Sequence, residues 1–185
     1  MKIFKTIFIT FIFLTSTVKA DLNQNLIKEL EQGGKLIFIR HAYAPGSGDP
    51  NNFNLNDCST QRNLSEEGKK QAEYIGEFFS DNEINIDKVL SSEWCRCKET
   101  AQIAFKNFST NSFLNSFYSS KFEKNKDKQI NALYDYIKKF KSNKNLVFVT
   151  HYVLISEVLN YGPSSGEIVV SDKNFNIIGS IEFNY

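Results

Sequence analysis

Histidine and cysteine are scarce in this chain: its 185 residues include two histidines and three cysteines. The cysteines have no pair of histidines near them in the sequence, which makes a zinc site a poor interpretation of them. Asp, Glu and His residues also form no cluster at the spacing of metal ligands, which a metal-dependent enzyme would need. We therefore predict that the chain holds no metal and no cofactor.

A long apolar segment is missing even at the amino end. The run from Ile7 to Leu14 is shorter than the roughly 18 to 20 residues that cross a bilayer, and polar Thr10 interrupts it. Lys2 and Lys5 precede this run, and Val18-Lys19-Ala20 follows it with a small residue at the expected cleavage site. This order is typical of a cleaved signal peptide, and an uncleaved anchor is the alternative.

Neither sign of charge dominates the chain, which has 22 basic and 21 acidic residues. We expect residues 1–20 to be removed and residues 21–185 to form an exported protein, periplasmic or secreted, with no stable membrane anchor. Loss of Lys2, Lys5 and Lys19 leaves 19 basic residues and a net charge of about −2. Such a balance does not favour a nucleic-acid partner.

The mature chain is long enough for one domain with a substantial core and too short for two. Helical and strand-like patterns follow one another along it. The helical patterns cover residues 22–31, 65–79, 93–105 and 127–141, and the strand-like ones cover residues 35–40, 86–91, 146–150, 167–170 and 177–183. We predict a single three-layer α/β domain in which helices flank a mostly parallel central sheet that ends in a C-terminal strand pair.

Both histidines directly follow a strand-like segment. One apolar run ends in Arg40-His41, and the other ends in His151. Because open parallel sheets bind ligands at the carboxyl ends of their strands, we expect one site that holds both imidazoles. Arg96, near the start of a predicted helix, adds a second guanidinium. A neutral imidazole can attack phosphorus, and arginine forks bind phosphoryl oxygens, so these residues predict a phosphoryl-transfer site. The alternative interpretation is that the two histidines are isolated core residues and the two arginines are unrelated to them.

Four short motifs occur along the chain: Arg40-His41-Ala42, then residues 63–72 (NLSEEGKKQA), residues 91–101 (SSEWCRCKETA), and Val149-Thr150-His151. In this order they resemble the motifs of the histidine phosphatase superfamily, which includes phosphoglycerate mutases and many phosphatases. The resemblance covers the chain from residue 36 to about residue 159. It identifies the chain as a small member with the phosphoglycerate mutase-like fold, which the expected signal peptide makes an exported one, and residues 21–185 as a histidine phosphatase domain.

The resemblance also implies roles for four residues. His41 is the phosphorylated nucleophile, and Arg40, Arg96 and His151 bind the phosphoryl group. The implied enzyme is a metal-independent phosphoric ester hydrolase that acts on a small phosphorylated substrate through a phosphohistidine. A non-catalytic anion- or phosphate-binding protein on the same scaffold is the alternative. Two further alternatives, a phosphoglycerate mutase and a thiol oxidoreductase, are less favoured by the sequence.

The general acid is missing from the place where the resemblance puts it. Ser116 stands where the mutase-like branch has a glutamate that protonates the leaving group. Glu167 is the preferred substitute, ahead of Glu123 and Asp49. Without a carboxyl group in place, the enzyme would favour good leaving groups such as those of phosphoanhydrides, acyl phosphates or phosphohistidine.

Export also changes how the cysteines are interpreted. In an oxidising compartment, Cys58 can pair with Cys95 or with Cys97, which leaves one thiol over. We predict one disulfide that braces the loops around Arg96.

Overall fold

Six strands form one sheet in the order β3-β2-β4-β1-β5-β6 in the computed structural model, which describes residues 24–183. Strands β1, β2, β3 and β4 are parallel, β5 is antiparallel to β1, and β6 is antiparallel to β5. The strands are β1 (Leu36–Arg40), β2 (Ile86–Ser91), β3 (Ser109–Thr110), β4 (Asn145–Thr150), β5 (Ile168–Ser171) and β6 (Ile177–Ile181). The mostly parallel sheet and its C-terminal strand pair are confirmed.

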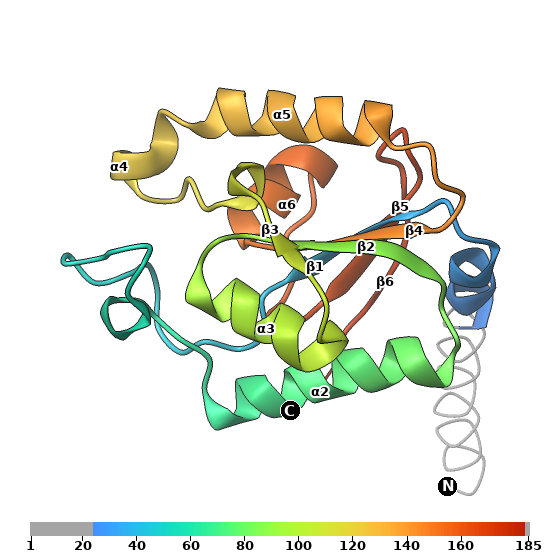
Figure 1. Ribbon diagram of the computed structural model, residues 1–185, viewed down its shortest axis with the longest axis horizontal. Helices are drawn as coiled ribbons and strands as arrows, with labels where there is room; N and C mark the ends of the chain where they lie inside the picture. The colour runs from blue at the N-terminus through green and yellow to red at the C-terminus, as the bar shows by residue number, and fades with distance from the viewer. Residues whose placement is uncertain (1–23, 184–185) are drawn as a thin grey trace, which may run out of the picture.

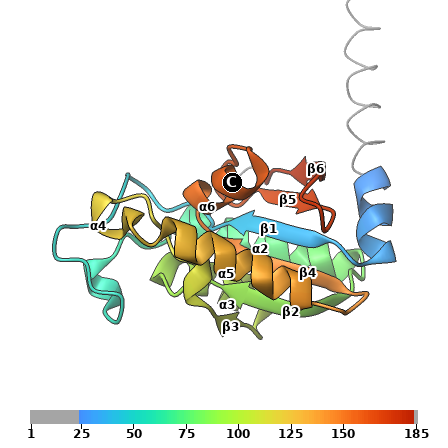
Figure 2. The same cartoon turned by 90° about the horizontal axis from the view of Figure 1, so that it is seen from above.

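Helices cover both faces of the sheet (Figure 1). On one face lie α2 (Glu66–Asp81) and α3 (Cys95–Phe105), and on the other lie α5 (Lys126–Lys139) and α6 (Tyr152–Leu159). The predicted single three-layer domain is therefore confirmed. The short helix α4 (Ser120–Glu123) and the loop between β1 and α2 lie at the end of the sheet toward which the β1 arrow points in Figure 2.

Alternation of apolar side chains along the central strands builds a core on each face. In β1, Ile37 and Ile39 pack in the cluster that includes α2 and α3, whereas Leu36 and Phe38 pack in the cluster that includes α5 and α6. Strand β4 divides its residues in the same way, and all six of them are buried. Burial of each such side chain contributes about 1.5–3 kcal/mol, so both faces hold the strand ends in fixed positions.

The amino end of α2 begins where the sequence predicts. The Ser65 hydroxyl accepts a hydrogen bond from the Gly68 amide at 3.2 Å, and Glu66 and Glu67 occupy the positively polarised first turn. The sequence did not indicate β3, α4 or the 3-10 turns Cys58–Thr60 and Ser112–Leu114. These segments are too short to carry a periodic pattern.

The predicted signal peptide, residues 1–20, lies outside the described residues. Within residues 24–183, no helix is long and apolar enough to cross a membrane.

Candidate active site

The pairing of β1 with β4 brings the two histidines together. Arg40 is paired with Thr150 in this parallel register, so the residues that follow, His41 and His151, leave the sheet side by side. The backbone amide of His41 donates to the Thr150 carbonyl oxygen at 2.9 Å. The centroids of the two imidazole rings lie 5.6 Å apart, and each residue is only 3% exposed. The predicted pairing of the imidazoles therefore has a definite geometric origin.

A third strand end adds Arg96. Strand β2 pairs with β4 on the side away from β1, and α3 begins four residues after β2 ends. Arg96 is the second residue of α3 and is 3% exposed. Its Nη2 lies 3.5 Å from Nδ1 of His151, so the guanidinium reaches the imidazole pair.

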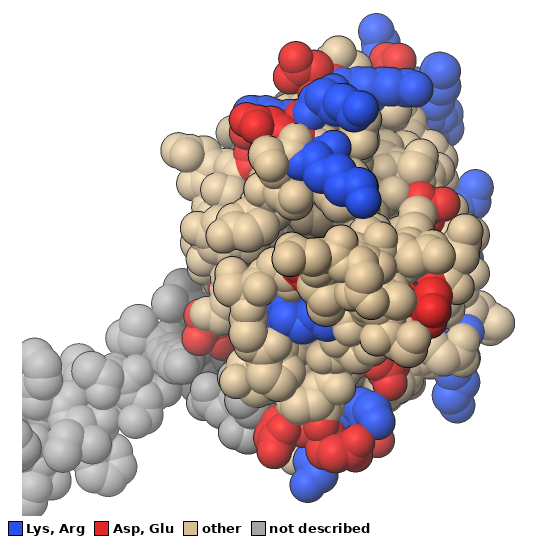
Figure 3. Space-filling model, turned by 90° about the vertical axis from the view of Figure 1, so that its left-hand side faces the viewer, with Lys and Arg blue, Asp and Glu red and all other residues tan. Residues whose placement is uncertain are grey.

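These side chains line a cavity of about 310 Å³. Within residues 24–183, Arg40, Arg62, Arg96 and Lys121 contribute positive charge to its lining, and Asp49 contributes the one carboxylate. Figure 3 looks onto this end of the molecule, where Lys and Arg side chains gather over α4 and α5 and further basic atoms lie recessed among uncharged ones. The cavity is small and cationic, which suits a compact anion.

Hydrogen bonding fixes the tautomer of His41. Its Nδ1 lies 2.9 Å from the Ala42 carbonyl oxygen, which can only accept, so Nδ1 carries the proton. In the neutral ring, Nε2 is then left with its lone pair. Burial, helped by the charge of Arg96, holds the pKa of His41 well below its usual range. His41 is therefore neutral at physiological pH and presents a nucleophilic nitrogen.

His151 is held by a chain of polar groups. Its Nε2 lies 2.9 Å from the Ser92 hydroxyl, which lies 3.0 Å from Oδ1 of Asn115. Burial and the charge of Arg96 also hold the pKa of His151 well below its usual range. Because the Ser92 hydroxyl donates its one proton to Asn115 Oδ1, it accepts from His151 Nε2. The neutral His151 ring therefore carries its proton on Nε2, and Nδ1 faces Arg96 as an acceptor.

Asp49 binds Arg96 through both carboxylate oxygens. Nη1 donates to Oδ1 at 2.7 Å and Nη2 donates to Oδ2 at 3.2 Å. Trp94 Nε1 and the Arg62 amide donate to the same carboxylate. Burial raises the pKa of Asp49, but the hydrogen bonds and charge of Arg96 outweigh burial and leave the pKa lowered. The Asp49 carboxylate is therefore ionised and orients the guanidinium.

The other two arginines approach the cavity from its sides. Arg40 Nη1 donates to the Pro163 carbonyl oxygen at 2.9 Å, and its guanidinium lies 5.5 Å from the centre of the Tyr152 ring. Arg62 is half-buried and donates to the carbonyl oxygens of Ala44 and Gly48. An arginine in such a polar loop would ordinarily be solvated, yet here the loop carbonyls hold Arg62 in the cavity wall.

The three candidate acids are placed very differently. Glu167 is 1% exposed, but its carboxylate accepts hydrogen bonds from the Tyr161 hydroxyl at 2.6 Å and the Ser164 amide at 2.7 Å, and it does not line the cavity. Glu123 is exposed and also lies outside the lining. Asp49 is the one of the three that lines the cavity, and Ser116 does so as well. The sequence ranks Glu167 first among the candidate acids, whereas distance to the cavity ranks Asp49 first.

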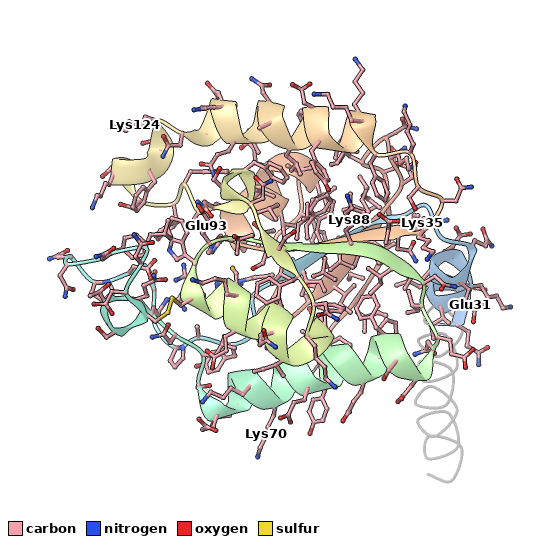
Figure 4. The ribbon with its side chains drawn as sticks, in the orientation of Figure 1. Glu31, Lys35, Lys70, Lys88, Glu93 and Lys124 are labelled. Atoms are coloured by element: carbon pink, nitrogen blue, oxygen red, sulfur yellow. A yellow bond between two sulfur atoms is a disulfide. The ribbon has the colours of Figure 1, made fainter. Side chains whose placement is uncertain are left out.

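A disulfide joins Cys58 to Cys95 and so ties the long loop to the first residue of α3, beside Arg96 (yellow bond in Figure 4). This settles which cysteine pairs with Cys58. Cys97 is left as a buried free thiol, and burial raises its pKa to about 12. Its thiolate form is thus scarce at physiological pH, which weighs against thiol chemistry.

We expect removal of this disulfide to lower the free energy of unfolding by about 2–4 kcal/mol, because it closes a loop over a sequence separation of 37. The double variant Cys58→Ser/Cys95→Ser and reduced wild type should show similar losses in urea denaturation. Reductant should not affect the double variant. Equal stability of the oxidised and reduced wild type would contradict the prediction.

Sequence reasoning missed several residues that shape the cavity. Ser92 lies inside a quoted motif, but its contact with His151 depends on the pairing of β2 with β4. Trp94 and Phe53 line the cavity, and no periodic pattern indicated them. Within residues 24–183, no group of three or more His, Cys, Asp or Glu residues is placed to hold a metal ion.

Comparisons with known proteins agree with this architecture. The family model described as histidine phosphatase superfamily (branch 1) matches residues 36–114. No curated protein matches the chain. A solved structure of a SixA protein from Agrobacterium tumefaciens is 19% identical, with a TM-score of 0.56 over 82% of this chain and 99% of that chain.

Two further solved structures share the fold. Phosphoglycerate mutase from Thermus thermophilus is 14% identical, with a TM-score of 0.59 over 81% of this chain and 99% of that one. The protein histidine phosphatase SixA complexed with tungstate is also 14% identical, with a TM-score of 0.53 over 82% of this chain and 94% of that one. At these identities the structural likeness shows the fold alone. Over residues 36–114, which are fewer than half of its 185 residues, the chain is similar to the histidine phosphatase superfamily.

Proposed function

We propose that this protein is a phosphatase that hydrolyses small phosphorylated substrates through a phosphohistidine on His41. The observation that carries the proposal is the hydrogen bond from His41 Nδ1 to the Ala42 carbonyl oxygen at 2.9 Å. This bond leaves Nε2 as the nucleophilic atom of a neutral ring. A histidine that only bound an anion would be expected to donate to it, and would need no free lone pair.

Arg40, Arg96 and His151 bind and neutralise the transferring phosphoryl group. Arg96 Nε is buried and has no hydrogen-bond partner among residues 24–183, so it is a donor for a phosphoryl oxygen. Fixed donors in a site with little water stabilise the charge that develops in the transition state. The contact between Ser92 and Nε2 holds the imidazole of His151 in place beside the same group.

The reaction has two steps. In the first, the lone pair of His41 Nε2 forms a bond to phosphorus, and the bond from phosphorus to the leaving oxygen breaks with its electron pair. In the second, water attacks the phosphohistidine, the phosphorus–nitrogen bond breaks, and inorganic phosphate is released. The proton that water loses balances the charge of the leaving group, so the overall reaction is hydrolysis.

We also propose that the protein acts outside the cytoplasm, in the periplasm or after secretion. The Cys58–Cys95 disulfide supports this proposal, because such bonds persist in oxidising compartments. The expected signal peptide over residues 1–20 supports it from the sequence.

A metal-free assay tests the activity. The mature chain, in the presence of a chelator, should release inorganic phosphate from at least one member of a panel of phosphomonoesters, acyl phosphates and phosphoanhydrides. Rapid quenching during turnover should trap acid-labile, base-stable phosphate on the protein. Saturable binding of phosphate without release from any donor would instead identify an anion-binding protein.

The low pKa of His41 predicts an unusual pH profile. An ordinary histidine, with a pKa near 6.5, would lose nucleophilic form about tenfold per pH unit in more acidic solution. Because burial and Arg96 lower the pKa of His41, its neutral form persists below pH 6.5. We therefore expect kcat/KM to show no fall near pH 6.5 and to decline only in more acidic solution, after correction for the substrate phosphate, whose second pKa is about 6. An inflection near pH 6.5 in the corrected profile would contradict this prediction.

A further inference from the structure

Aromatic side chains form part of the cavity wall beside the reacting groups. The centroid of the Trp94 ring lies 5.4 Å from that of His151, with the rings edge to face. Phe53 stacks on Trp94 at 5.0 Å, and Phe122 meets both rings edge to face, at 5.6 Å from Phe53 and 5.5 Å from Trp94. All of these residues line the cavity. A group attached to a phosphoryl unit at the histidines would therefore lie within reach of aromatic surface.

Two tyrosines extend this surface toward solvent. Tyr118 is 65% exposed and Tyr152 is 45% exposed, although large apolar side chains are usually covered. Both line the same cavity, and Arg40 lies over the Tyr152 ring. The cavity thus combines a cationic floor with aromatic walls, and the fold itself does not use the exposed tyrosine surfaces for packing.

Among the described residues, no carboxyl group in this cavity is placed to protonate a leaving group. Asp49 is the one acidic residue that residues 24–183 contribute to the lining, and both of its oxygens are bound to Arg96 as an ionised carboxylate. Ser116 occupies the position where the family resemblance places a glutamate. An alkoxide, whose conjugate acid resembles water with a pKa of about 15.7, leaves poorly without a proton. A phenolate, whose conjugate acid has a pKa of about 10, leaves far more readily.

We propose that the cavity selects phosphate monoesters of phenols, with the aryl ring held against the Phe53 and Tyr152 surfaces. The inference rests on the proposed phosphatase activity and names its substrate class. His41 Nε2 forms a bond to phosphorus as the bond to the aryl oxygen breaks, and the phenolate leaves with the electron pair. Water then releases phosphate from His41, and its proton neutralises the phenolate, so that a phenol and hydrogen phosphate are the products.

A matched set of substrates separates ring binding from leaving-group quality. Phenyl phosphate has both the ring and a good leaving group, benzyl phosphate has the ring with an alkoxide leaving group, and acetyl phosphate has a good leaving group with no ring. We expect kcat/KM for phenyl phosphate to exceed that for benzyl phosphate about 100-fold or more, which is the size of the missing acid catalysis. KM for phenyl phosphate should be lower than KM for acetyl phosphate, which has no ring to bind the aromatic wall.

Variants of one wall residue test the ring contact. Phe53→Leu keeps an apolar side chain but removes the stacking surface, and should raise KM for phenyl phosphate about 3- to 10-fold. KM for acetyl phosphate should not change, whereas a general structural defect would raise KM for both substrates. Tyr134→Leu alters an aromatic residue on α5 that does not line the cavity, and should change neither value.

Two further substrates identify the source of the aryl phosphate. Free phosphotyrosine and a short phosphotyrosyl peptide share the same chemistry, and turnover of either supports the inference. A lower KM for the peptide would point to polypeptide substrates, and equal values would point to the aryl phosphate alone.

The outcomes distinguish this inference from the activity on which it rests. Turnover of acetyl phosphate without turnover of any aryl phosphate would overturn the substrate class and leave the phosphatase in place. Equal kcat/KM for benzyl and phenyl phosphates would also overturn it, because an acid would then be acting. Failure of every donor to be hydrolysed or to label the protein would overturn both.

Discussion

Replacement of His41 by alanine is expected to lower kcat by about 10³-fold or more and to abolish the acid-labile phosphoprotein. The reason lies in the geometry of the ring. Its Nδ1 is committed to the Ala42 carbonyl oxygen, and the unprotonated Nε2 of a neutral imidazole is the atom that can attack phosphorus. The other imidazole, His151, is held by Ser92 and Arg96. It cannot take over the attack without breaking those contacts.

Chemical rescue gives this prediction a sharper control. His41→Gly leaves space for a free imidazole molecule, which should restore part of the phosphate release at millimolar concentrations without restoring the labelled protein. Each variant should unfold cooperatively in urea, which separates loss of chemistry from loss of fold. Full phosphate release by His41→Ala would show that another group is the nucleophile.

Much of the fold could be predicted because its strands carry an unambiguous pattern. The buried runs of β1 and β4 have apolar residues at almost every position, which only a sheet covered on both faces explains. Ser65 fixed the start of α2 through a capping bond that local sequence encodes. Short segments such as β3 depend on pairing with distant residues and leave no local signal.

The candidate site likewise contains some residues that the sequence predicts and others that it does not. His41, His151 and Arg96 follow strand ends, and strand order places them together, so sequence patterns could identify them. Asp49 lies in the long loop, where its contact with Arg96 depends on how the loop folds back. Neither the periodicity nor the spacing of residues in the sequence indicates how this loop folds back. The choice between Cys95 and Cys97 as the disulfide partner depended on it too.

Glu167 shows a different limit of sequence reasoning. Its position after the second histidine made it an attractive proton donor, and its burial would suit that role. The structure instead engages its carboxylate with Tyr161 and Ser164, next to the backbone where Gly166 meets Arg40 and His41. A buried carboxylate that is fully hydrogen-bonded supports the backbone near the histidines rather than reacting. Sequence spacing cannot tell these two uses of a glutamate apart.

Replacement of Arg96 by lysine is expected to lower kcat/KM by about 10²- to 10³-fold, although the positive charge remains. Arg96 uses Nη1 and Nη2 to hold the Asp49 carboxylate and still has a buried Nε for a phosphoryl oxygen. A lysine ammonium is a single point of charge and cannot do both at once. Steady-state kinetics with the best donor from the substrate panel would measure the loss.

Asp49→Asn is the matched comparison, because it is isosteric and changes the partner of Arg96 rather than Arg96 itself. An amide can still accept from the guanidinium through its oxygen, so positioning weakens but persists, and we expect kcat/KM to fall less than about tenfold. The loss should also be the same for phenyl and benzyl phosphates, since an ionised Asp49 donates no proton to either leaving group. A loss as large as that of Arg96→Lys, and confined to benzyl phosphate, would make Asp49 the general acid. It would thereby contradict the assignment of this carboxylate to holding Arg96.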